Sequence, residues 1–138
     1  MAEITLRGRT IPLVYTTWEM KQIQEEIAPL DKFAYMVFGR NPEDEDDTSL
    51  YGGPEHLRAA GAMIRILGNA GLEEAGEKPD LTDKWVLRSL KPSNLAEAVA
   101  QCMQAINDGN KSEIPPKQDD GPVDVTLEKM NKKKEQEN

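Results

Sequence analysis

The hydrophobic pattern of the chain centres on residues 53–76, where apolar or small residues recur at the three- and four-residue spacing of one helix face. The repeating positions are Leu57, Ala60, Gly61, Ile64, Leu67, Gly68 and Gly71. Pro54 fits the first helical position, and Gly53 before it is an acceptable cap. Each interior Gly disfavours the helix by about 1 kcal/mol relative to Ala. We therefore expect packing to hold this helix, with another element lying close along its small residues as core rather than as a ligand groove.

Residues 3–15 alternate apolar and polar positions on both sides of Arg7-Gly8-Arg9. This pattern predicts a β-hairpin, with Gly8 supplying the positive φ of a tight turn. Pro12 cannot donate a ladder hydrogen bond, so it should face the open side of an edge strand. A lone two-stranded hairpin is marginal in water. Its apolar face is therefore expected to pack on helices.

Two helices are predicted between the hairpin and the central pattern. The first runs from Trp18 to about Ile27 with Thr17 as its cap and Glu19 on its solvent side. The second runs over residues 30–38 and stops at Gly39.

Two more helices follow the central one. A short helix begins at Asp80–Asp83, and Leu81, Trp85 and Leu90 are its expected buried residues. The last opens at Pro92–Ser93, with Ser93 or Asn94 as its cap, and ends at Gly109. Its inner stripe contains Leu95, Val99, Cys102 and Ile106. The fold class is therefore mainly α with an N-terminal β-hairpin (α+β), with about five helices.

Composition divides the chain into a helical domain over residues 1–110 and a flexible, disordered tail over 111–138. The domain contains a solvated acidic loop at 41–50. Within the tail, Val123–Leu127 alternates apolar and polar residues. This segment is either a linker without a binding role or a short strand that adds to the sheet edge of a partner. The predicted partner-binding residues are Val123, Val125, Leu127 and Met130.

The net charge of −8 argues against nucleic-acid binding and against anionic membrane surfaces. No apolar run reaches the ~18–20 residues of a membrane span. The N-terminus shows no signal-peptide pattern, and the single cysteine, Cys102, forms no intrachain disulfide. A cytoplasmic protein is expected.

Candidate chemistry is sparse. The five consecutive acids Glu43–Asp47 suggest a metal site, but calcium loops place carboxylates at alternate positions around a Gly. His56 has no second His or Cys at ligand spacing and no nucleophile beside it, which favours an ordinary surface or helix-start histidine. We therefore predict no catalytic, cofactor-binding or metal-binding residue and no enzyme activity.

Three stretches together resemble the tail assembly chaperones of long-tailed bacteriophages and prophages, closest to the small acidic proteins of Gram-positive prophages. They are ITLRGRTIPLVYTTWEMKQIQEEI, LAEAVAQCMQAINDG and PPKQDDGPVDVTLEKMNKKK. The resemblance implies a protein of the bacterial host cytoplasm that binds the tape-measure protein and keeps it soluble while tail-tube subunits assemble around it. Such a chaperone is absent from the mature virion. The expected contact residues include flexible apolar side chains, with Met20, Met36, Met63 and Met103 as candidates.

The resemblance also suggests a longer frameshifted form, for which an adenine-rich run encoding Lys132–Lys134 is a hypothesis. Three other functions stay open. They are a structural minor tail or head–tail connector protein retained in the virion, an enzyme or metal-binding regulator using His56 and the acidic loop, and a nucleic-acid-binding regulator. Homo-oligomers are also expected to be accessible, because both hairpin strands are sheet edges.

Overall fold

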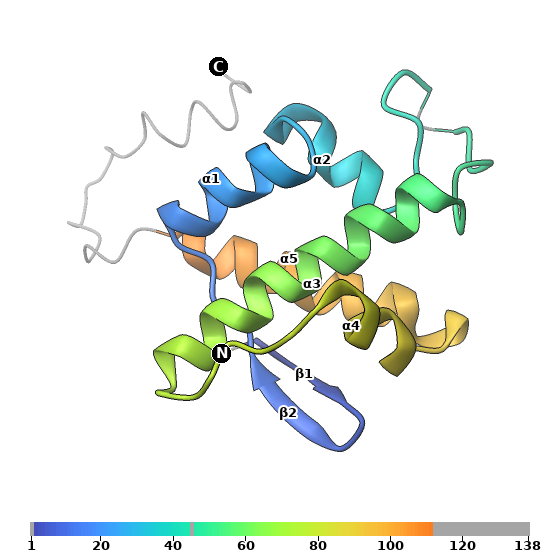
Figure 1. The fold of residues 1–138 in the computed structure, drawn as a ribbon. Coiled ribbons are helices and arrows are strands. Elements are labelled where there is room, and N and C mark those ends of the chain that lie inside the picture. The colour runs from blue at the N-terminus through green and yellow to red at the C-terminus, as the bar shows by residue number, and fades with distance from the viewer. Residues whose placement is uncertain (1, 45, 112–138) are drawn as a thin grey trace, which may run out of the picture.

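A computed structural model describes residues 2–44 and 46–111 of the 138-residue chain (Figure 1). Within these residues, five α-helices follow an antiparallel hairpin of β1 (Glu3–Leu6) and β2 (Arg9–Pro12). The helices are α1 (Thr17–Glu26), α2 (Leu30–Val37), α3 (Pro54–Glu74), α4 (Asp83–Ser89) and α5 (Leu95–Asn110), with a 3-10 turn at Pro92–Asn94 before α5. This confirms the predicted fold class. The tail predicted for 111–138 lies outside the described residues beyond Lys111.

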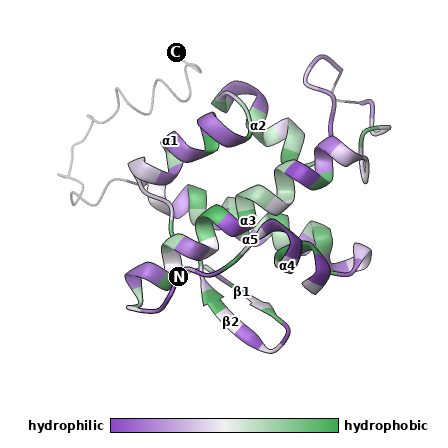
Figure 2. Ribbon diagram, in the orientation of Figure 1, coloured by the Kyte–Doolittle hydropathy of each residue, from purple (hydrophilic) through white to green (hydrophobic). Residues whose placement is uncertain are grey.

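Helix α3 is the centre of the molecule, and it contacts α1, α2, α4, α5 and β2. It is buried on most of its circumference beyond the first turn, and hydrophobic residues run along it between the flanking helices (Figure 2). Its glycines allow close approach, as predicted. A methyl group at Gly71 would overlap the Pro12 carbonyl of β2, and one at Gly68 would lie 2.6 Å from Leu81 Cδ1. Close backbone approach therefore fixes the hairpin against α3.

The hairpin turns at Arg7 and Gly8, which both have positive φ, 52° and 76°. Two central residues in this conformation make a type I′ turn, which suits the right-handed twist of paired strands. Leu6 pairs with Arg9 and Glu3 with Pro12. The apolar face of the hairpin packs into the core, as expected for a sheet of only two strands.

The start of α1 differs from the sequence prediction. Thr16, not Thr17, is the N-cap, and its hydroxyl accepts a hydrogen bond from the Trp18 amide. Glu19 was expected on the solvent side, but the structure buries it. Its carboxylate turns back to Thr16, where it accepts hydrogen bonds from the amide (2.9 Å) and from the hydroxyl (2.6 Å). This reciprocal capping box satisfies amides that the first helical turn leaves unpaired.

The last two helices follow the predicted order with adjusted ends. Leu81 is buried, whereas Trp85 and Leu90 are only partly buried. Helix α5 continues to Asn110 rather than ending at Gly109. Cys102 lies in the inner stripe of α5, where burial raises the pKa of its thiol to about 12. In the part of the chain that the structure describes, no helix is long and apolar enough to cross a membrane.

Candidate functional site

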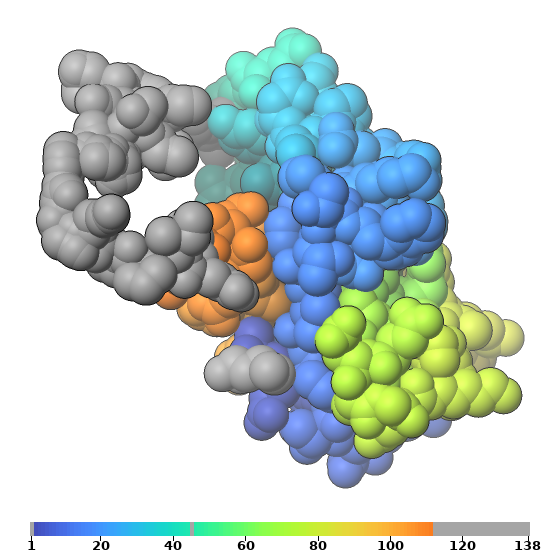
Figure 3. All heavy atoms as spheres, turned by 90° about the vertical axis from the view of Figure 1, so that its left-hand side faces the viewer, coloured from blue at the N-terminus to red at the C-terminus, as the bar shows by residue number. Residues whose placement is uncertain are grey.

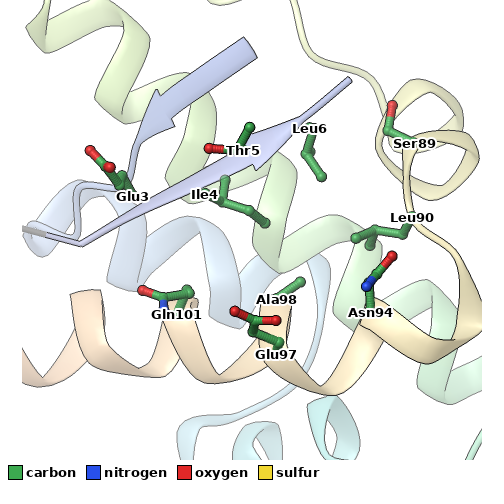
Figure 4. A pocket seen from close by; sticks show the side chains of 10 residues that line it. All are labelled: Glu3, Ile4, Thr5, Leu6, Ser89, Leu90, Asn94, Glu97, Ala98 and Gln101. Atoms are coloured by element: carbon green, nitrogen blue, oxygen red, sulfur yellow. The ribbon is translucent and has the colours of Figure 1, made fainter. Parts of the chain in front are cut away.

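A groove of about 560 Å³ lies between β1 and the N-terminal half of α5 (Figure 4). Glu3–Leu6 of β1 form one wall, and the other wall consists of Ser89, Leu90, Asn94, Glu97, Ala98 and Gln101. The Glu3 end of the strand lies toward Gln101, and the Leu6 end lies toward Leu90 and Asn94 (Figure 4). We call this feature the β1 groove. Its volume falls in the range of small-molecule sites, roughly 300–1,000 Å³.

The β1 groove runs along the open edge of the strand. Consecutive side chains of a strand point to opposite faces of its sheet, so a groove lined by all four residues of β1 follows an edge. The opposite edge of β1 is occupied by β2. The Leu13 amide donates to the Ala2 carbonyl at 3.0 Å, which sets the alternation of the antiparallel ladder. Glu3 and Thr5 therefore direct their N–H and C=O groups away from β2, toward the open edge.

The same alternation tests the prediction for Pro12. Pro12 is opposite Glu3 in a pair that does not exchange hydrogen bonds, so the position where it lacks an N–H faces away from β1. The expected outward placement is confirmed, but this side of β2 is not open, because Gly71 of α3 packs against the Pro12 carbonyl. The missing N–H also leaves the edge of β1, but not that of β2, with an uninterrupted set of donors and acceptors.

The chemistry of the β1 groove suits an extended peptide. Outward N–H and C=O groups of an edge strand pair with the backbone of an added strand, and alternate side chains then enter pockets. The apolar part of the β1 groove is formed by Ile4 and Leu6 together with Leu90 and Ala98. The carboxylates of Glu3 and Glu97 give its rim a negative charge.

A second surface lies where α2 and the start of α3 meet. Phe38, Leu50 and Tyr51 leave 42%, 46% and 49% of their areas exposed. Phe38 directly follows α2, and Leu50 and Tyr51 end the loop that leads into α3. We call these three residues and the acidic loop 41–50 the α2–α3 junction. It lies at the end of the molecule opposite the C-terminal end of α3 (Figure 3).

His56 holds the α2–α3 junction together. Its Nδ1 accepts a hydrogen bond from the Gly52 amide at 2.8 Å, and its Nε2 lies 3.1 Å from the Val37 carbonyl. Both contacts are satisfied by the neutral tautomer that carries the proton on Nε2. The ring also lies 4.6 Å from the Tyr51 ring, centroid to centroid. The histidine therefore ties the residue before Phe38 to the residue after Tyr51.

Burial lowers the pKa of His56, and the hydrogen bond to Val37 partly opposes this shift. His56 was expected to be an ordinary surface or helix-start residue. It does lie in the first turn of α3, but only 3% of it is exposed. Its two backbone partners identify a structural role.

The acidic loop is built from short side-chain turns. Asn41, Asp44 and Asp47 each accept a hydrogen bond from the amide two residues later. The side-chain and backbone hydrogen bonds to Ser49, followed by the one from Asn41, lower the pKa of Asp47. Across residues 2–44 and 46–111, no three His, Cys, Asp or Glu side chains come together in a way that could hold a metal ion.

The remaining predicted contact residues divide into two groups. Val123, Val125, Leu127 and Met130 lie outside the described residues. Among the methionines, Met20, Met36 and Met103 are partly buried, but Met63 is fully buried in α3 and is not available to a partner. No protein-family model, curated protein or solved structure matches this chain.

Sequence reasoning missed both surfaces as sites. The alternation in residues 3–6 signalled an edge strand, but not that α5 would lie beside it. No local pattern indicated that the single histidine would contact a backbone carbonyl 19 residues earlier in the chain.

Proposed function

We propose that this protein is a tail assembly chaperone of long-tailed bacteriophages, a non-enzymatic adaptor that binds the tape-measure protein in the host cytoplasm. The proposal rests on the resemblance of the hairpin, the last helix and the tail to that family, and on the α2–α3 junction as the observation that carries it. A tape-measure protein is a long helix whose apolar faces are exposed until the tail tube encloses them. Such a helix aggregates unless another protein covers it.

The α2–α3 junction has the chemistry needed to cover an amphipathic helix. Scattered apolar residues are common on protein surfaces, but Phe38, Leu50 and Tyr51 belong to two segments that one histidine joins. The acidic loop beside them carries Glu43, Asp44, Asp46 and Asp47. An apolar stripe flanked by Lys or Arg on a partner helix would complement this combination. The tail residues Val123, Val125, Leu127 and Met130 are proposed as a second contact.

The test is co-expression of the full-length protein with the tape-measure protein encoded beside it, followed by affinity capture. A Phe38→Ser, Leu50→Ser double variant removes exposed apolar area with little effect on the core. Trp18→Ser is the matched control, because Trp18 is 62% exposed on α1, outside the α2–α3 junction. We expect soluble tape-measure protein with wild type and with Trp18→Ser, and a several-fold loss with the double variant.

The alternative of a structural virion component makes the opposite prediction for purified particles. A chaperone is absent from them, whereas a minor tail or connector protein is present in fixed stoichiometry. An insoluble, uncaptured tape-measure protein together with this chain in virions would overturn the proposal.

A further inference from the structure

The open edge of β1 needs an occupant whose backbone is extended and whose side chains alternate in polarity. Ile4 and Leu6 face the core, whereas Glu3 and Thr5 are exposed on the other face. A strand added along this edge continues both faces. A matching occupant therefore alternates apolar and polar residues over about the length of the four-residue β1.

The chain itself contains such a segment at Val123–Leu127, whose sequence is VDVTL. Val123, Val125 and Leu127 would continue the apolar face beside Ile4 and Leu6. Thr126 would lie on the exposed face, where the hydroxyls of Thr5 and Thr10 already form a cross-strand pair at 3.1 Å. We propose that Val123–Leu127 docks in the β1 groove of its own chain as a third strand.

The length of the intervening chain permits this docking. The described chain ends at Lys111, ten residues beyond Gln101 at the Glu3 end of the β1 groove, which is about 15 Å along a helix. Residues 112–122 provide eleven residues, which reach up to about 36–40 Å when extended. A segment tethered this closely has an effective concentration in the millimolar range, so even a short strand competes well against free peptides and second copies.

Charge gives a further argument. Glu3 and Glu97 make the rim of the β1 groove acidic, and residues 128–138, which follow the segment, carry four lysines against three glutamates, a net charge of +1. These lysines have the sign that the rim attracts. Asp124 is negative like the rim, but it would lie on the exposed face, where water screens its repulsion from the glutamates.

This inference does not depend on the proposed chaperone function. If the tail also binds the tape-measure protein, docking and partner binding compete for the same residues. The docked state would then shield the apolar segment until a partner displaces it.

The test places one cysteine on the hairpin and one on the tail of the full-length protein. Thr5→Cys is combined with Thr126→Cys or with Asp124→Cys, so that two registers are sampled. The matched control replaces Thr5→Cys by Thr10→Cys, the exposed cross-strand neighbour on β2. Cys102 is retained, because it is fully buried and its thiol has a raised pKa.

We expect an intrachain disulfide with Thr5→Cys, detected by mass spectrometry and by mobility on a non-reducing gel. A third strand on the open edge lies about 5 Å from β1 but about 10 Å from β2. Crosslinking to Thr10→Cys should therefore be roughly tenfold slower or absent, because Cα atoms more than about 7 Å apart are not bridged. Equal rates for the two hairpin positions, or no crosslink, would overturn the proposal. A disulfide-linked dimer would overturn the assignment to the same chain and indicate the tail of a second copy.

Amide exchange provides a readout without cysteines. The Thr5 amide points to the open edge, so docking for nine-tenths of the time slows its exchange about tenfold. In full-length protein, Val125→Asp should remove this protection, whereas Thr126→Ser should keep it. Exchange of the Thr5 amide that is as fast in wild type as in Val125→Asp would contradict docking.

Discussion

The two ends of α3 meet their neighbours in different ways. At the C-terminal end, Gly68 and Gly71 let Leu81 and the Pro12 carbonyl approach so closely that a methyl group has no room. At the N-terminal end, His56 bridges α2 and the preceding loop through two hydrogen bonds, and large apolar side chains remain exposed around it. One end is fixed by steric fit between backbones, and the other by a single polar side chain. The first suits a permanent core, whereas the second suits a surface that adjusts to a partner.

The largest effect is expected for Gly71→Ala at the tightly packed end. The added methyl group overlaps backbone atoms, which cannot move without shifting β2, so we expect a loss of about 3 kcal/mol in the free energy of unfolding. Urea denaturation of the full-length protein measures it.

Gly61→Ala on the same helix is the matched control. Its methyl group would lie 3.0 Å from Cγ of Leu87, a side chain that is only partly buried, and Ala favours the helix by about 1 kcal/mol over Gly. We expect a change within about 1 kcal/mol of wild type. Equal losses of stability for Gly71→Ala and Gly61→Ala would contradict the claim that backbone contact fixes the C-terminal end of α3.

A smaller effect is expected for His56→Ala. The Val37 carbonyl and the Gly52 amide lose their partner, and a small cavity forms, so stability should fall by about 2 kcal/mol. Amide exchange should show the loss concentrated at residues 37–56. Glu55→Gln, at the exposed preceding residue, should stay within about 0.5 kcal/mol of wild type. A uniform loss across the whole chain would contradict a local bridge.

The same bridge predicts a pH dependence. Because the pKa of His56 is lowered from 6.5 by folding, the unfolded chain binds the extra proton more readily. This contribution to stability is therefore fully present above about pH 6.5 and is lost as the pH falls toward the pKa of the folded state. The chain has one histidine, so the stability difference between wild type and His56→Gln isolates it. A difference that stays constant from pH 7.5 to 5 would contradict the lowered pKa.

The smallest effect is expected for Asn41→Ala in the acidic loop. Its side chain accepts a hydrogen bond from the Glu43 amide and donates one to Asp47, both in a solvent-facing loop. Global stability should change by less than about 0.5 kcal/mol, whereas the Glu43 amide should exchange faster. A large loss of global stability would show instead that the loop contributes to the core as the C-terminal end of α3 does.

Much of this fold was predictable, because its signals are local. The glycine and alanine pattern predicted the central helix and its close neighbours, and Gly8 predicted the hairpin turn. Helix ends were less exact: Thr16 replaced Thr17 as the cap, because the carboxylate of Glu19 completes a box with Thr16.

The candidate surfaces were not predictable in the same way. The β1 groove exists because α5, about 90 residues later in the chain, lies beside the first strand. The burial of His56 depends on Val37, 19 residues earlier. Contacts of this kind arise from tertiary packing and leave no periodic trace in a single sequence.

The position of the hairpin has a consequence for synthesis on the ribosome. Its apolar face packs against α3, where Gly68 lies close to Ile11, and against Ala98 of α5. At about 5–20 residues per second, the roughly 90 residues between β1 and Ala98 take about 5 to 20 seconds to emerge. During this interval Ile4, Leu6 and Ile11 have no folded surface to cover them. Strand β1 is therefore made long before the helix that protects it, and nascent chains should depend on factors that shield the hairpin.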